Sequence, residues 1–163
     1  MNNVLRHIVR FVLLFALQDL LFNNLHWLGI CHPYVYLIGL LMLPVSLPRW
    51  AEMLIGTVTG LVMDMLCSTT GVHMAACVAL SYARPLLIDR FIQDAQRIST
   101  QTDSQTMGNR FTILAIMLIA LHHSIVFVLE AWSFEHIGWL VTSIVLSSLI
   151  TFILTFLYDK AQR

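Results

Sequence analysis

Charged side chains are scarce in this sequence. Asp, Glu, Lys and Arg together make up only 11% of its 163 residues, whereas 58% of the residues are hydrophobic. A soluble domain usually carries about a quarter charged residues, so this chain lacks the charge to cover a water-exposed surface. The scarcity excludes an ordinary soluble protein and indicates that lipid surrounds most of the chain. The net charge is zero with His counted as neutral, which gives no electrostatic basis for binding nucleic acid.

Catalytic and metal-binding signatures are also missing. The sequence contains no G-x-S-x-G, H-E-x-x-H or P-loop motif. Its three cysteines, Cys31, Cys67 and Cys77, show no metal-ligand spacing. We therefore expect no enzyme activity, no metal and no cofactor. A disulfide between Cys31 and Cys67 stays open, because the predicted topology places both outside the cytoplasm.

Long uncharged runs take the place of these signatures. They lie between Asp19 and Arg49, Asp64 and Arg84, Arg110 and Glu130, and Glu135 and Asp159. A helix needs roughly 20 apolar residues to cross the hydrocarbon, and long continuous runs favour helices over barrel strands. The predicted fold class is all-α, a single polytopic membrane domain (1–163) with six transmembrane helices in one bundle. The predicted helices cover residues 5–22, 34–47, 50–66, 72–91, 111–132 and 138–158, with a cytoplasmic loop at 93–110.

The basic residues predict the orientation of this bundle. All nine Lys and Arg residues fall on one side of the six-span arrangement. The positive-inside rule then places both termini in the cytoplasm. The second predicted helix is short for a span, and Pro44 should kink it or end its regular hydrogen bonding. A five-span alternative, with that segment re-entrant, would scatter the basic residues across both faces.

A stripe of small and acidic residues follows the predicted third helix. Glu52, Gly56, Gly60 and Asp64 recur every four residues and share one slowly rotating face. Gly56 and Gly60 let another backbone approach closely, whereas a charge in the membrane costs about 2.5–3.5 kcal/mol on insertion scales. We interpret Asp64 either as a hydrogen-bonded or protonatable pivot at a helix contact, or as a cap that meets water at the outer end of its own helix.

Other polar residues lie in or beside the predicted spans. Gly71 follows the third helix and is free to take a positive φ. Gln18 lies near the end of the first helix, where it either faces neighbouring helices or reaches headgroup water. His122 and His123 lie near the middle of the fifth helix and point about 100° apart, so they cannot share one partner. We expect them to be hydrogen-bonded packing residues rather than a proton relay, and Glu130 is the remaining polar candidate on that helix.

An ordered set of motifs covers most of the chain. It comprises Gln18 near the end of a first helix with a basic start, a short proline-containing helix ending in Pro48-Arg49-Trp50, Gly56-x-x-x-Gly60-Leu61-x-x-Asp64, then Thr69, Gly71, His73-x-Ala75, and Arg84-Pro85. This set resembles the rod shape-determining protein MreD family. Many members have a serine three residues after the aspartate and a proline in the same turn, where this chain has Cys67 and Thr70.

The resemblance implies a non-enzymatic inner-membrane scaffold subunit of the bacterial cell-elongation (rod) complex. Such a subunit couples cytoskeletal filaments to peptidoglycan synthesis and maintains cell shape. Its partners would be an MreC-like single-span membrane protein, the actin-like MreB and a peptidoglycan synthase pair. The family's bundle is similar to the substrate-binding subunits of energy-coupling-factor vitamin transporters, which supports six helices. Gly56, Gly60, Asp64, Gly71 and Gln18 would then contact neighbouring helices or a partner.

Two other functions fit individual residues. A small-molecule-binding subunit of a vitamin-type transporter would enclose a polar pocket where Asp64, His73 and Glu130 converge. A proton-coupled channel would line one wet path with Asp64, His122 and His123. Bound ligand or a continuous wet path would distinguish these alternatives from a scaffold with a core filled by side chains.

Overall fold

The computed structural model describes residues 3–24, 31–91, 102–131 and 137–162. Within these ranges every regular element is helical, so the predicted all-α fold class is confirmed there. The elements are α1 (Asn3–Leu17), a π-helical turn η1 (Gln18–Phe22), α2 (Leu37–Leu41), α3 (Arg49–Cys67), α4 (Val72–Phe91), α5 (Ser104–Met107), α6 (Asn109–Ala131) and α7 (Ile137–Ala161).

Five of the six predicted helices are present, with ends close to the predicted ones. The first is α1 continued by η1, and the third to sixth are α3, α4, α6 and α7. Local signals set the ends of α3. Pro48 is extended before its first turn, and Ser68 ends it in the left-handed region at a φ of 56°. The predicted loop 93–110 contains α5 and the start of α6, while its residues 93–101 lie outside the described part of the chain.

The helix predicted over 34–47 is wrong. The structure has only the five residues of α2 there, and Met42 leaves the helical conformation with a φ of −93° and a ψ of 17°. Pro44 prevents a longer helix, because it has no N–H for the carbonyl of Leu40 and its ring would clash with that group. We call residues 31–48, which hold α2 between two irregular stretches, the broken segment.

Three helices, α3, α6 and α7, are long and apolar enough to cross a membrane. By comparison, α1 has only 15 residues, and α4 carries Arg84, Asp89 and Arg90. The outer faces of α3 and α7 carry exposed apolar side chains such as Leu61 and Val145, which lipid would cover. The six-span count and the likeness to transporter subunits stay predictions.

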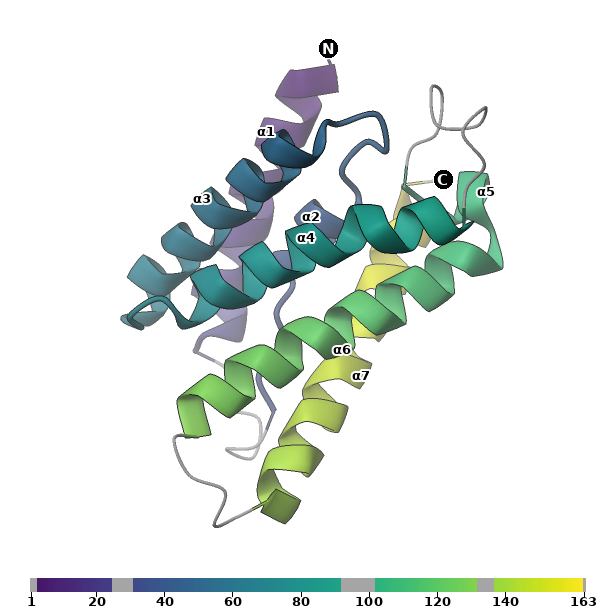
Figure 1. The fold of residues 1–163 in the computed structure, drawn as a ribbon. Helices are drawn as coiled ribbons and strands as arrows, with labels where there is room; N and C mark the ends of the chain where they lie inside the picture. Colours follow the sequence, from purple (N-terminus) through teal and green to yellow (C-terminus); the bar gives the residue numbers. More distant parts are fainter. Residues whose placement is uncertain (1–2, 25–30, 92–101, 132–136, 163) are drawn as a thin grey trace.

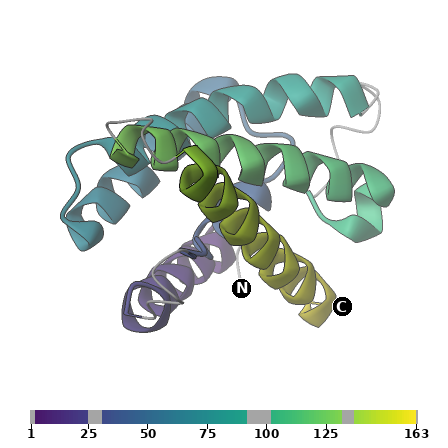
Figure 2. The ribbon, with the colours of Figure 1, turned by 90° about the horizontal axis from the view of Figure 1, so that it is seen from below.

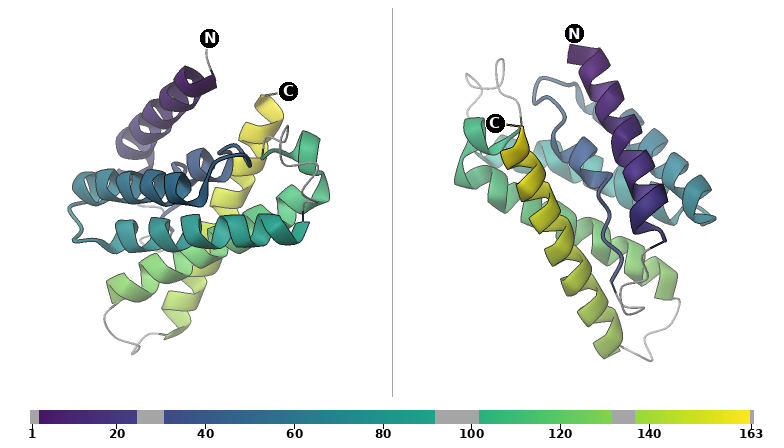
Figure 3. Two further views of the ribbon diagram at one scale, coloured as in Figure 1. Left: turned by 45° about the horizontal axis from the view of Figure 1, so that its top comes forward. Right: turned by 180° about the vertical axis from the view of Figure 1, so that it is seen from behind.

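The long helices pack in series, α3 on α4, α4 on α6 and α6 on α7 (Figure 1). The short α2 lies at the centre of the fold, and all five of its residues are buried. Figure 2 shows α1 and α7 on the same side of α6, away from α4. In the left-hand view of Figure 3, α1 lies apart from α3. The start of α1, the start of α3 and the end of α7 lie toward one end of the molecule, and the α3–α4 turn lies toward the other (Figure 1).

The two glycines of the stripe set a close approach between α3 and α4. A Cβ added to Gly60 would lie 2.7 Å from the carbonyl oxygen of His73, and one added to Gly56 would lie 2.9 Å from that of Cys77. These contacts are too short for a real Cβ, and a backbone oxygen cannot rotate away. The helix that packs on the stripe is therefore α4 of the same chain.

Replacing Gly60 by Ala should push α4 away from α3 and lower the free energy of unfolding by about 1–3 kcal/mol, as overpacking does in a filled core. Unfolding of the purified protein in detergent, followed by circular dichroism, measures this change. Gly138→Ala in α7 is the matched control, because nothing lies within 4 Å of a Cβ added there. An equal effect of the two substitutions would show that the α3–α4 contact is not tight.

Candidate functional site

Asp64 joins the end of α3 to the start of α4. It is 5% exposed, and its two carboxylate oxygens accept hydrogen bonds of 3.0 Å from the backbone N–H groups of His73 and Met74. The hydroxyl of Thr69 donates a third bond, of 2.6 Å. The first N–H groups of a helix have no partner within it, and a carboxylate there also opposes the positive end of the helix dipole. Asp64 therefore caps α4, not the end of its own helix.

The turn that brings α4 back onto α3 depends on two residues with positive φ. Ser68 has a φ of 56° and Gly71 a φ of 85°. Gly71 is thus placed in the conformation that the sequence allowed for it. This turn lays α4 over Gly56 and Gly60, so a partner helix could reach the stripe only by displacing α4.

Gln18 holds the backbone at the beginning of the broken segment. Its side chain is 1% exposed and faces the protein interior. The amide oxygen accepts a 2.8 Å hydrogen bond from the N–H of Val35, and the amide nitrogen donates to the carbonyl of Pro33 at 3.3 Å. An amide group suits this position because it supplies both the donor and the acceptor that an irregular backbone needs.

A polar stripe on α7 holds the same stretch from the other side. The hydroxyl of Ser147 accepts from the N–H of His32 at 3.0 Å, and that of Thr151 accepts from the N–H of Tyr34 at 3.1 Å. The sequence analysis missed this stripe, although its four-residue spacing on an apolar helix is a readable signal. Its members are Ser143, Ser147, Thr151, Thr155 and Asp159, all buried.

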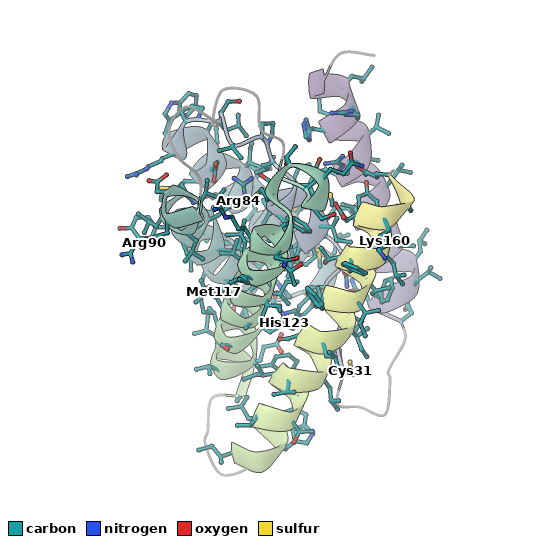
Figure 4. All side chains as sticks on the ribbon, turned by 90° about the vertical axis from the view of Figure 1, so that its right-hand side faces the viewer. Cys31, Arg84, Arg90, Met117, His123 and Lys160 are labelled. Atoms are coloured by element: carbon teal, nitrogen blue, oxygen red, sulfur yellow. The ribbon has the colours of Figure 1, made fainter. Side chains whose placement is uncertain are left out.

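Arg84 of α4 holds the far end of the broken segment. Its guanidinium is 1% exposed and forms a 2.8 Å ion pair with Glu52 of α3, which is 2% exposed. The same group donates to the carbonyls of Leu41 and Leu43 and to the hydroxyl of Thr102. In Figure 4 Arg84 lies among the helices, whereas Arg90, two turns further on, points outward.

Sequence reasoning did not identify the Glu52–Arg84 pair as a site. In the sequence, Glu52 stands out only as part of the stripe, and Arg84 only as part of a motif. A signal was available, because the two residues lie nearly the same number of positions from the α3–α4 turn. Antiparallel packing of the two helices therefore brings opposite charges together at one depth.

The phenol of Tyr36 joins two histidines at the centre of the protein. Its oxygen lies 2.8 Å from Nε2 of His122 and 3.2 Å from Nδ1 of His73, and the thiol of Cys77 is adjacent. All four side chains are at most 1% exposed. Such a buried, hydrogen-bonded cluster orders the core, because the Tyr36 hydroxyl is held by both histidines.

The ring of His123 packs against that of His122, but its two nitrogens bind outside this cluster. Its Nδ1 donates to the carbonyl of Ile119 at 2.8 Å, and its Nε2 lies 3.3 Å from the hydroxyl of Thr151. Figure 4 places it between α6 and α7. Glu130 is exposed near the end of α6, unlike the buried Asp64 and His73. No group of three His, Cys, Asp or Glu side chains in the described ranges could hold a metal.

All three cysteines are free thiols. Cys31 is buried and accepts a long contact of 3.8 Å from the hydroxyl of Ser147. Burial raises the pKa of the Cys31 thiol, and the contact with Ser147 acts in the opposite direction. Cys67 is half-buried at the end of α3, and the Cys31–Cys67 disulfide that the sequence left open is not formed.

Comparisons of the chain with protein-family models, with curated proteins and with solved structures find no match. The function is therefore inferred from the residues described above. Their common feature is that buried polar side chains bind backbone groups of the same chain, which suits them to hold a shape.

Replacing Asp64 by Ala should lower the free energy of unfolding by about 2–3 kcal/mol, because two N–H groups at the start of α4 lose their acceptor. Asp64→Asn keeps one acceptor oxygen, so its free energy of unfolding should lie between those of the wild-type chain and Asp64→Ala. Asp19→Ala is the matched control, since Asp19 is a half-buried acid whose carboxylate accepts a long bond of 3.4 Å from the side chain of Asn23. Denaturant unfolding in detergent compares the three, and equal losses for Asp64→Ala and Asp19→Ala would contradict the capping role.

Removing Arg84 should destabilise the protein far more than removing Arg49. Arg84→Met removes the ion pair of the buried Glu52 carboxylate, which should cost about 3–5 kcal/mol. Arg49 also pairs across α3 and α4, with Asp89 at 3.0 Å, but its side chain is 65% exposed, so Arg49→Met should cost less than about 1 kcal/mol. The double variant Arg84→Met with Glu52→Gln should lose less free energy of unfolding than the two single variants lose when their losses are added. Strict additivity would show that the two residues do not interact.

Proposed function

We propose that this chain is a non-enzymatic scaffold subunit of a bacterial cell-elongation complex. It would couple actin-like MreB filaments, directly or indirectly, to an MreC-like single-span protein and a peptidoglycan synthase pair, and so maintain cell shape. The ordered set of motifs from Gln18 to Arg84-Pro85 supports this proposal through its resemblance to the MreD family.

The filled centre of the protein is the observation that favours a scaffold. Tyr34, Tyr36, His73, His122 and His123 occupy it, with at most 5% of each side chain exposed. Their rings pack against one another, with centroids 5.1–6.4 Å apart among these five residues. A scaffold needs a fixed shape, whereas a transport subunit needs room for its substrate.

The proposed location is the bacterial inner membrane, with several spans and both termini in the cytoplasm. Three candidate spans support membrane insertion. The ends of the described chain lie toward the same end of the molecule as the start of α3 (Figure 1). Arg6, Arg10, Arg49 and Lys160 belong to these parts of the sequence, so the positive-inside rule gives that end to the cytoplasm.

A small-molecule-binding subunit of a vitamin-type transporter is the second candidate. The broken segment favours it, because helices interrupted at the centre of a membrane protein often surround a substrate. In this chain, however, side chains of η1, α4 and α7 already bond the interrupted backbone. Calorimetric titration of the purified protein with vitamins would support this candidate if it gave saturable binding.

Co-purification from native membranes tests the scaffold function. A tagged chain expressed in a rod-shaped bacterium should retain the MreC-like protein, and depletion of the chain should make the cells round. Normal rods after depletion, with no elongation protein retained, would contradict the proposal.

The same experiment tests whether the tight α3–α4 contact at Gly56, Gly60 and Asp64, here called the α3–α4 lock, is needed for partner binding. Gly56→Leu and Asp64→Leu, verified as inserted at normal levels, should lose the partner because α4 shifts. Gly138→Leu is the control, since a side chain there meets open space. Full retention by the first two variants would show that the lock does not shape the partner surface.

A further inference from the structure

An apolar groove lies between α1, the end of the broken segment and α3. Its volume is about 550 Å³. The lining includes Phe11 and Phe15 of α1, Pro44 and Leu47 of the broken segment, and Ile55 and Val58 of α3. The groove exists because α1 packs mainly on α2 and stays apart from α3 (Figure 3).

The shape of this lining favours a hydrocarbon chain over a protein helix. Transmembrane helices associate through small residues that let their backbones approach closely. Among the residues that line the groove, Thr59 is of this small type, but none is Gly, Ala or Ser. The close-packing glycines of α3, Gly56 and Gly60, face α4 on another side of the helix. A flexible acyl chain can follow a lining of large Phe, Leu and Ile side chains.

The charge at one end of the groove favours an anionic headgroup. His7 lines that end, and Arg6 precedes it. In the described part of the chain, Nδ1 of His7 and Nε of Arg6 are buried without a hydrogen-bond partner. The first acidic residue of the sequence is Asp19, and Arg10 is already held by Gln162 and the carbonyl of Met42. The Arg6 guanidinium therefore supplies the positive charge at this end, and a basic group beside a membrane-embedded groove attracts anionic lipids.

We propose that this groove is a binding site for an anionic phospholipid. One acyl chain lies along Phe11, Phe15 and Val58, and the phosphate lies at the end of the groove near Arg6 and His7. The proposal requires a membrane but does not depend on the scaffold function, so either can fail alone.

Lipid retention tests the site. The full chain is reconstituted in nanodiscs of equimolar phosphatidylglycerol and phosphatidylethanolamine, released into detergent and weighed with its bound lipid by native mass spectrometry. The wild-type chain should retain phosphatidylglycerol preferentially. Arg6→Gln should lower this preference about fivefold, whereas Arg90→Gln, an outward-pointing arginine of α4 (Figure 4), should leave it unchanged.

Two bulky substitutions test the acyl-chain part of the site from opposite walls. Val58→Trp in α3 and Ile8→Trp in α1 should fill the groove and abolish retention of phosphatidylglycerol. Val141→Trp is the control, on an exposed position of α7 outside the groove. Thermal unfolding verifies that each variant is folded, and the two walls give independent tests if one variant is not.

Three results would overturn the proposal. The first is full retention by either folded groove variant. The second is equal retention of phosphatidylethanolamine and phosphatidylglycerol by the wild-type chain. The third is loss of a co-purifying transmembrane protein from the groove variants while lipid retention stays unchanged, which would assign the groove to a partner helix.

Discussion

The irregular backbone of the broken segment imposes the strongest constraint on this protein. Peptide groups outside a helix need hydrogen-bond partners, and in an apolar environment water does not supply them. The chain meets this need with side chains from three directions. Gln18 binds the backbone at Pro33 and Val35. Ser147 and Thr151 of α7 bind the N–H groups of His32 and Tyr34. Arg84 binds the carbonyls of Leu41 and Leu43 at the far end. Six of the sixteen buried polar side chains in the described ranges bond this backbone directly, those of Arg10, Gln18, Arg84, Thr102, Ser147 and Thr151.

The lock between α3 and α4 serves the same segment indirectly. Arg84 reaches the carbonyls of Leu41 and Leu43 only if α4 lies at the correct height and distance relative to α3. Gly56 and Gly60 set the distance between the two helices. Asp64 sets the position of α4 along α3, because it caps the first turn of α4. Glu52 then neutralises the arginine at the other end of the pair. Asp64 thus fixes the closed end of the α3–α4 hairpin, and Arg84 at its open end supports the broken segment.

The sequence predicts the helices better than it predicts their contacts, and the reason is physical. Long uncharged runs identify the apolar surroundings and leave a helix as the default, which suffices for α4, α6 and α7. The same logic fails at 34–47, because an apolar run does not reveal that Gln18, Thr151 and Arg84 satisfy its backbone from elsewhere in the fold. The stripe predicted a helix contact, but periodicity on one helix cannot name the helix opposite. The polar spacing on α7 does predict a buried contact face, since Ser and Thr recur there every fourth residue.

The broken segment also explains the shape of the surface between α1 and α3. A continuous helix over 34–47 would give α1 and α3 a common neighbour along their length. With only five residues of helix, α2 contacts α1 near Gly39, where a Cβ would meet the ring of Phe11 at 2.6 Å, and the chain then turns at Pro44. The turn residues Leu43, Pro44 and Leu47 line the groove that remains between α1 and α3. The groove is therefore a consequence of the interruption that organises the core, and a molecule that fills it would also contact Leu43, Pro44 and Leu47 of the broken segment.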